Sequence, residues 1–434
     1  MSRRMPGGDI WAQPGQARDQ GWPEQGRDQG SPVQGRDQGW PGQGRDQGSP
    51  VQGRDQGWPG QGRDQRRRGG RRPQRRGSAA RGAAACVAAA LAMAGAGAAS
   101  AMAATPAAPS WHIVKRVRGG ALGDFTAAVA VGRNGGWAFD GVSRPTAWHR
   151  SGTSWDQVSF PGRSGDEVVA AGASSASNVW AFTDRGARAR ALRWNGSQWS
   201  VQGSFPGQIG GAVVLSASDV WAFGEPTAPG RGLGAWHYNG REWARVASGR
   251  GLEGGSGLSA RDIWAFAGTD VARWNGRTWT RTSVAGLLPA RQPLNDPAVV
   301  GIDALGPGNI YAIGNGNLED EGGPTVILHY NGHSWRKVAQ GNFGAGTSPL
   351  QQVTSDGRGG LWIPMPGFGG RRSYLVHYSA GRLTAAALPV RPSRIDVQSV
   401  SRIPGTTDVL GGGFTHTAGN PGTGVVAVIL EYEG

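Results

Sequence analysis

Cysteine is nearly absent from this chain of 434 residues, since Cys86 is the only one. A single cysteine excludes an intrachain disulfide framework and any metal site built from two or more thiolates. Leucine is sparse as well, whereas the chain holds 77 glycines and 19 tryptophans. This composition argues against a helical bundle, because glycine disfavours helix interiors and bundles need an apolar stripe along each helix.

Lysine is also scarce, with only Lys115 and Lys337 beside 43 arginines. Lys and Arg number 45 against 30 Asp and Glu, a formal net charge of +15. Residues 1–81 hold 16 arginines and 8 acids, so a charge of +7 remains for residues 82–434. A basic domain suits anionic partners such as wall polymers, acidic polysaccharides, lipid headgroups or an acidic protein, although abundant arginine equally fits genomic base composition.

Residues 1–81 form a low-complexity tail in which Arg-Asp-Gln recurs every nine residues, from Arg18 to Arg63. We predict a disordered tail, because it has too few aliphatic residues to offset the entropy lost on ordering. A calcium-binding β-roll is one alternative, but Gly48 occupies an apolar position of that motif and each unit contains proline. The arginines of residues 66–76 suggest nucleic-acid binding; we favour a basic flank and do not expect a nucleic-acid partner.

Residues 82–104 are 23 uncharged residues, mostly alanine and glycine. A basic flank, an apolar stretch and Ala-x-Ala sites around Ser100 have the order of a signal peptide. At ~1.5 Å per residue a helix of this length also spans a ~30 Å bilayer core, so a single-pass anchor stays open. In both cases the positive-inside rule predicts a cytoplasmic N-terminus and an extracytoplasmic, secreted or anchored domain behind a linker over residues 105–110.

Residues 111–434 carry two repeated signatures. The first is an aromatic-Ala-aromatic or aliphatic tripeptide, degenerate in its sixth copy and weaker in a seventh at Val409-Leu410, and its first six copies are marked by Trp137, Trp180, Trp221, Trp264, Tyr311 and Trp362. The second follows the first and reads Asn-Gly-x-x-Trp, with divergent copies at His149–Trp155 and His377–Leu383. Its tryptophans are Trp155, Trp199, Trp243, Trp279 and Trp335. Successive copies of the first signature lie 41 to 51 residues apart.

The second signature predicts a β-hairpin, because Asn-Gly supplies the two positive-φ residues of a type I′ turn. With Asn195 and Gly196 at its centre, Trp194 faces Ser197 and lies diagonal to Trp199. Side chains alternate along a strand, so Trp194 and Trp199 share one face. The two signatures and the runs between them give four short strands per unit, in unit three near Gly211–Ser216, Val220–Gly224, Gly234–Tyr238 and Trp243–Val246.

Four-stranded repeats of this length are typical of β-propeller blades, whose faces are buried by radial stacking. The first signature occurs seven times, but the last unit ends one strand short. The segment from Trp111 to Val114 matches the fourth strand of other units. We therefore predict an all-β, seven-bladed, monomeric propeller over residues 111–434, closed by the strand at Trp111. The repeated aromatic residues are expected to form the core between blades.

The pattern V-W-A-F-G followed by H-Y-N-G-x-x-W resembles Trp-rich repeat propellers of exported actinobacterial proteins, which are broadly similar to kelch and galactose-oxidase-type propellers. The resemblance covers about three quarters of the chain and implies an architecture rather than an activity. The Gly-His…Trp-Asp pattern of WD40 repeats and the sialidase Asp box are both missing from the sequence. Copper–cysteine chemistry is excluded, because Cys86 lies in the apolar segment.

Histidine recurs at one position per repeat, where other units carry arginine, so we interpret it as structural: His149, His237, His329 and His377. Asp or Asn just before the first signature is interpreted as a turn-stabilising residue. No His-x-x-His pair occurs in the sequence, and we predict neither a metal nor a cofactor. No catalytic residue stands out.

The variable connections are those from second to third strands and from one blade to the next, and they should share one face of the propeller. Functional residues are expected there. The candidate binding residues are Arg185, Arg188, Arg190, Arg291, Glu319, Asp320, Glu321, Arg371 and Arg372.

The sequence thus favours a non-enzymatic binding module at the cell envelope, with an anionic polymer or a protein as its partner. A carbohydrate-active hydrolase or lyase on the same scaffold is the alternative, and a cluster of acids in the loops would then supply its carboxylates. A third possibility is a structural envelope protein whose uncleaved helix links the propeller to a cytoplasmic tail.

Overall fold

The computed structural model describes residues 109–117, 123–140, 144–228, 231–247, 251–291, 296–316, 323–344, 350–367, 372–389, 394–416 and 425–434. All of them belong to one compact unit, Ala99–Gly434. The predicted tail, the apolar segment 82–104 and its linker up to residue 108 lie outside the described residues. Within the described ranges, no helix has the length and apolarity that crossing a bilayer requires.

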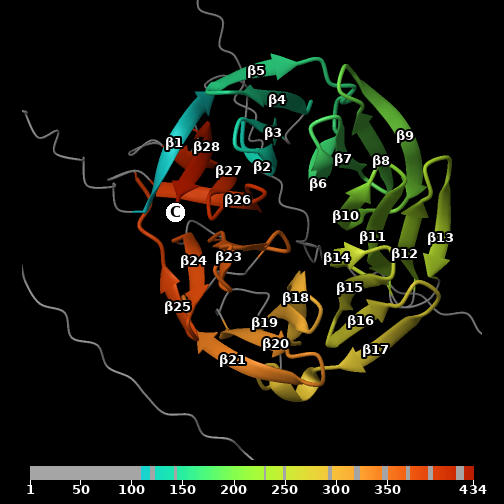
Figure 1. Cartoon of the computed structure of the whole chain (residues 1–434), viewed down its shortest axis with the longest axis vertical. Helices are drawn as coiled ribbons and strands as arrows, with labels where there is room; N and C mark the ends of the chain where they lie inside the picture. Colours follow the sequence, from blue (N-terminus) through green and yellow to red (C-terminus); the bar gives the residue numbers. More distant parts are fainter. Residues whose placement is uncertain are drawn as a thin grey trace, which may run out of the picture. The chain divides into compact units, whose positions relative to one another are not determined.

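The described strands form seven antiparallel sheets of four strands each, arranged as blades around a central axis (Figure 1). In blades 1 to 6 the strands follow chain order outward from the axis. Blades 1 to 3 comprise β2 (Phe125–Gly132), β3 (Gly135–Asp140), β4 (Thr146–Ser151) and β5 (Ser154–Val158); β6 (Glu167–Ser175), β7 (Asn178–Arg185), β8 (Arg188–Trp194) and β9 (Trp199–Pro206); and β10 (Ile209–Ser216), β11 (Asp219–Ala228), β12 (Arg231–Tyr238) and β13 (Trp243–Ala247).

The remaining blades repeat this arrangement, with one short 3₁₀ helix, η1 (Ala285–Leu287), between blades 4 and 5. Blades 4 to 6 comprise β14 (Gly254–Ser259), β15 (Asp262–Ala267), β16 (Asp270–Trp274) and β17 (Trp279–Ser283); β18 (Ala298–Gly306), β19 (Asn309–Asn315), β20 (Thr325–Tyr330) and β21 (Trp335–Gly341); and β22 (Thr354–Ser355), β23 (Leu361–Met365), β24 (Tyr374–Ser379) and β25 (Arg382–Ala385). Blade 7 contains β26 (Arg394–Arg402), β27 (Val409–His416), β28 (Val425–Glu433) and β1 (Ser110–Val117).

The ring is closed by β1, which supplies the outermost strand of blade 7 as the sequence predicts. Its order is β1-β28-β27-β26, and Trp111 pairs with Tyr432. Trp111 is 4% exposed and packs edge-on against Trp362 of blade 6, with ring centroids 5.2 Å apart. The two ends of the propeller chain therefore hydrogen-bond to each other, and in Figure 1 the cyan β1 lies beside the red β28.

The predicted strands of unit three are confirmed, and each is slightly longer than expected. The predicted type I′ turn is wrong. Trp194 pairs directly with Trp199, which leaves a four-residue loop in which Asn195 Oδ1 accepts hydrogen bonds from the backbone N–H groups of Ser197 and Gln198. Gly196 has φ +99°, whereas Asn195 keeps a negative φ. The asparagine side chain stabilises this wider turn, so only glycine must adopt a positive φ.

The repeated aromatic residues form the core between blades, as predicted. Trp137 of blade 1 lies between Trp194 and Trp199 of blade 2, with ring centroids 4.9 and 5.1 Å away. The same arrangement links Trp180 to Trp243 and Trp221 to Trp279. Further around the ring, the corresponding residues are Trp264 with Trp335, Tyr311 with Tyr378, and Trp362 with Trp111. Trp155 completes the ring by packing against Leu410 of blade 7.

Glycine is abundant partly because the inner strands converge on the axis. A Cβ atom at Gly255 would lie 2.7 Å from the Phe223 ring of the preceding blade and 2.6 Å from the Trp264 carbonyl oxygen. Any side chain there would force blades 3 and 4 apart. These glycines permit the close approach that a seven-fold ring of sheets requires near its centre.

Candidate functional site

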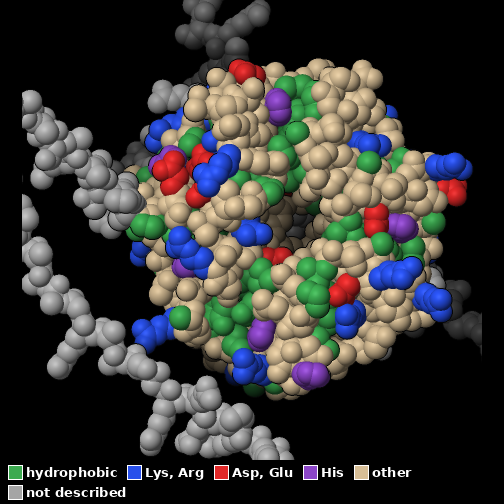
Figure 2. Space-filling model, viewed as in Figure 1, with side chains coloured by type: hydrophobic (Ala, Val, Ile, Leu, Met, Phe, Trp, Pro, Cys, Tyr) green, Lys and Arg blue, Asp and Glu red, His purple; other side chains and the backbone are tan. Residues whose placement is uncertain are grey.

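The recurring histidines are structural, which agrees with their interpretation from the sequence. His237 Nε2 lies 2.9 Å from Asp219 Oδ1, and its ring stacks on Trp221 with centroids 4.5 Å apart. His377 repeats this with Asp356 and Trp362. The acidic residues therefore do more than stabilise turns, because they also bind the third strand. On the face of the propeller that Figure 2 shows, the histidines are spread around the ring rather than gathered in one place.

The propeller has two ends with different loops. We call the end with the second-to-third and blade-to-blade connections the loop face, and the opposite end, with the hairpin turns, the turn face. Arg190, a predicted binding residue, is buried at the loop-face end of β8. Its guanidinium forms an ion pair with buried Asp166 and donates to the Pro161 carbonyl at 3.2 Å. Arg190 thus holds the connection between blades 1 and 2 in place.

Arg185 and Arg188 flank the tight β7–β8 turn on the loop face. They are register partners, and both are exposed. Arg163 lies exposed in the adjoining connection, where Arg185 Nε would be 3.5 Å from a Cβ atom at Gly165. The side chains of these three arginines form no ion pair with any residue that the structure describes. Of the nearby acids, Asp166 pairs with Arg190 and Asp184 accepts from the backbone N–H of Ile209, whereas Glu167 is exposed.

The other predicted binding residues do not join this cluster. Arg291 forms an exposed ion pair with Asp296, with Nε and Oδ1 2.6 Å apart. The Arg372 guanidinium lies 5.2 Å from the centre of the Tyr374 ring. Glu319, Asp320, Glu321 and Arg371 lie outside the described residues.

Three carboxyl groups gather at the loop-face ends of blades 1 and 2. Burial raises the pKa of Asp124 to about 7, and the charges of Asp140 and Glu167 add to this increase. Burial also raises the pKa of Glu167. Asp124 Oδ1 is buried without a hydrogen-bond partner among the described residues. No group of acids, histidines or cysteines in the described ranges is arranged to hold a metal ion.

A central cavity of about 370 Å³ lies on the propeller axis, and the space-filling view shows the surface hollowed there (Figure 2). Inner strands or their flanking residues from all seven blades line it. Gln352 Nε2 donates to the Val169 carbonyl of blade 2 at 3.3 Å. The Gln351 amide, turned so that its nitrogen faces two carbonyls, donates to Gly210 at 2.5 Å and Glu253 at 3.3 Å. Both glutamines precede the short β22 and link blade 6 to blades 2, 3 and 4.

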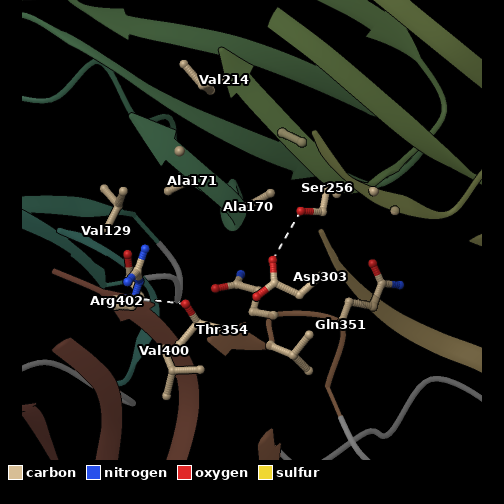
Figure 3. A pocket seen from close by; sticks show the side chains of 18 of the residues that line it. Val129, Ala170, Ala171, Val214, Ser256, Asp303, Gln351, Thr354, Val400 and Arg402 are labelled. Carbon is tan, nitrogen blue, oxygen red and sulfur yellow. Dashed lines mark hydrogen bonds between the residues drawn. The ribbon is translucent and has the colours of Figure 1, made fainter. Parts of the chain in front are cut away.

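The cavity wall is polar on blades 4 to 7. The inner-strand residue opposite the repeated aromatic residue is Ser256, Asp303 and Thr354 in blades 4 to 6, and Ser401 opposite Leu410 in blade 7. Each accepts a hydrogen bond from a backbone N–H of the following blade: Ala304, Ser355, Arg402 and Ala130. In blades 1 to 3 this position holds valine or glycine. Figure 3 shows Asp303 and Thr354 across the cavity from Val129, Ala170 and Ala171.

These cavity residues were not predicted from the sequence. A comparison of the repeats at the inner-strand position could have found them, since Asp303 is the one acid in a series of Val, Gly, Ser and Thr. The repeat signatures lie on the second to fourth strands, so a search based on them does not include the innermost strand.

No protein family matches the chain, and no curated protein is similar to it in sequence. Solved structures are similar in fold. The WD40 repeats of RRP9 give a TM-score of 0.50 at 12% identity, covering 74% of this chain and 99% of that one. YCF48 bound to a D1 peptide gives 0.48 at 12% identity, over 75% and 97%. YCF48 from Cyanidioschyzon merolae gives 0.49 at 13% identity, over 75% and 99%. The RRP9 match, at 12% identity, shows the fold alone, a seven-bladed propeller with WD40-like neighbours; the comparisons do not show the kelch resemblance, an actinobacterial origin or export.

Proposed function

We propose that this protein is a binding module at the cell envelope whose loop face recognises an anionic polymer. The observation that carries the proposal is the arginine cluster of Arg163, Arg185 and Arg188, exposed together while Asp166 and Asp184 are engaged in structural contacts. Guanidinium groups bind carboxylate or phosphate oxygens through two parallel hydrogen bonds. A repeating polyanion would contact several of these groups at once.

The topology supports the choice of face. β1 begins at Ser110, which pairs with Glu433 at the turn-face end of β28. The chain therefore enters the propeller at the turn face, opposite to the arginine cluster. We infer that an anchor over residues 82–104 would be joined to the propeller at its turn face.

The test compares two double variants of the full chain. Arg185→Ala/Arg188→Ala removes two of the three arginines of the cluster, and Arg241→Ala/Arg277→Ala removes two exposed arginines from the hairpin turns of the turn face. Binding to purified teichoic acid should weaken about tenfold for the first variant, at ~0.5–1 kcal/mol per exposed charge contact, and less than about twofold for the second. Binding should also weaken with added salt. Equal effects of the two variants would refute the proposal, and binding to poly-glutamate alone would point to an acidic protein instead.

A second candidate function is cleavage of a polysaccharide, as a hydrolase or a lyase. The carboxyl groups of Asp124, Asp140 and Glu167 favour it. A carboxyl with a pKa of about 7 beside two further carboxyl groups has the properties of a general acid. The test is release of reducing ends from wall polysaccharide by the wild type and by Asp124→Asn. Loss of activity without any loss of thermal stability would support an enzyme, and the absence of any activity in the wild type would dismiss it.

A further inference from the structure

The central cavity combines one carboxylate with an apolar wall. Asp303 lies on its polar side, whereas Val129, Ala170, Ala171 and Val214 line the opposite side (Figure 3). At ~30 Å³ per water, about 370 Å³ would hold roughly a dozen water molecules. This space accommodates a group the size of an amino-acid side chain. The alanine and glycine residues of the wall leave that space open.

The carboxylate of Asp303 is held in place but its charge is incompletely compensated. Ser256 Oγ donates to Asp303 Oδ1 at 3.2 Å, and the backbone N–H groups of Ala304 and Ser355 also donate to the side chain. Arg402 is the charged group that lowers the pKa of Asp303. Even so, burial is the larger effect and raises this pKa to about 6. A raised pKa means that the surroundings disfavour the anion, so an added positive charge would stabilise it.

Arg402 also lines the cavity, and its guanidinium is hydrogen-bonded to a backbone carbonyl. Its Nη1 donates to the Thr406 carbonyl at 3.4 Å in the turn between β26 and β27. The cavity is also spanned by Gln351 and Gln352, whose amides bond backbone carbonyls of three other blades. Among the described residues that line the cavity, Asp303 is the one with an acidic side chain.

We propose that the central cavity binds a cationic group on a short apolar stem, with Asp303 contacting the guanidinium or ammonium and the stem packing against the alanine and valine wall. Such a group belongs either to a free alkyl amine or guanidine, or to an arginine or lysine side chain of a partner polypeptide. This site is independent of the loop-face arginines, which attract the opposite charge.

The test is titration of the full chain with n-propylguanidine and its neutral isostere n-propylurea. At neutral pH the guanidine should bind and the urea should not. Asp303→Asn should weaken binding at least tenfold, since a charge-assisted hydrogen bond contributes ~1.5–3 kcal/mol. Binding should also weaken about tenfold near pH 5, where a carboxyl with a pKa of about 6 is mostly protonated. A peptide with one arginine that competes equally well would identify a side chain as the ligand, and failure to compete would identify a free amine or guanidine.

Thr126→Val is the matched control. Thr126 Oγ1 donates to the Val168 carbonyl of the next blade at 2.7 Å, which is an inter-blade bond away from the cavity lining. This variant should bind propylguanidine within about twofold of wild type. If Asp303→Asn does not fold, two measurements on the wild type still test the proposal. These are the pH dependence of propylguanidine binding and the comparison of propylguanidine with propylurea. Equal binding of guanidine and urea, binding unaffected at pH 5, or no binding of propylguanidine at about 20 mM would overturn the proposal.

Discussion

The pairing of β1 with β28 predicts that one disulfide can lock the propeller into a closed ring. Ser110 and Glu433 are register partners, and both are exposed. The double variant Ser110→Cys/Glu433→Cys, with Cys86 replaced by alanine, should therefore oxidise without disturbing the core. Directly opposite residues on antiparallel strands lie within the Cα separation of ~4.4–6.8 Å that a disulfide requires.

The expected stabilisation follows from the size of the loop that the bond closes. The disulfide would connect both ends of the propeller and enclose nearly its whole chain. In the chain-entropy description, a loop of more than 300 residues contributes about 6 kcal/mol to the free energy of unfolding. With an unfolding entropy of about 2.1 cal/mol/K per residue, this corresponds to a Tm increase of roughly 8–9 °C.

The assay is thermal unfolding of the oxidised and the reduced variant, together with thiol quantification and mass spectrometry. The control pairs Ser110→Cys with Gly434→Cys, because a shift of one residue points the second side chain to the other face of the sheet. Only the in-register pair should oxidise readily and lose its extra stability on reduction. Equal oxidation of both pairs, or a Tm that does not respond to reduction, would refute the closure of the ring by β1.

Three further substitutions test the core, the histidine position and the carboxyl cluster. Trp137→Ala should lower the free energy of unfolding by about 4 kcal/mol in chemical denaturation, since it empties a fully buried site between blades 1 and 2. His377→Ala should cost about 1–2 kcal/mol through its bond to Asp356 and leave loop-face binding unchanged. Asp124 has a raised pKa of about 7, so its protonation stabilises the fold below pH ~4, and this contribution is lost as the pH rises through about 7. Asp124→Asn should therefore become more stable relative to wild type between pH ~4.5 and ~8, by roughly 3 kcal/mol at 1.36 kcal/mol per pH unit, and an unchanged difference would exclude a protonated Asp124.

The predictions that depended on the repeated aromatic residues are confirmed. Repeated aromatic residues indicated seven blades, and the unpaired Trp111 segment indicated how the ring closes. The type I′ turn was wrong because the alternation of residues does not reveal that Asn195 accepts two backbone hydrogen bonds and widens the loop. The resulting register shift leaves Trp194 and Trp199 on the same face, so the blade packing was predicted correctly despite the error.

The sequence by itself determined the architecture, because each blade repeats the same short-range pattern of aromatic residues, glycines and turns, and seven similar sheets bury their faces only by stacking into a ring. The tertiary structure alone decided which charged side chains are available. Arg190 is buried in an ion pair with Asp166, whereas its neighbours Arg185 and Arg188 are exposed. Asp303, Gln351 and Val129 come from different blades and meet only at the axis. Contacts between residues so far apart in the chain depend on ring closure, and no spacing within a repeat encodes them.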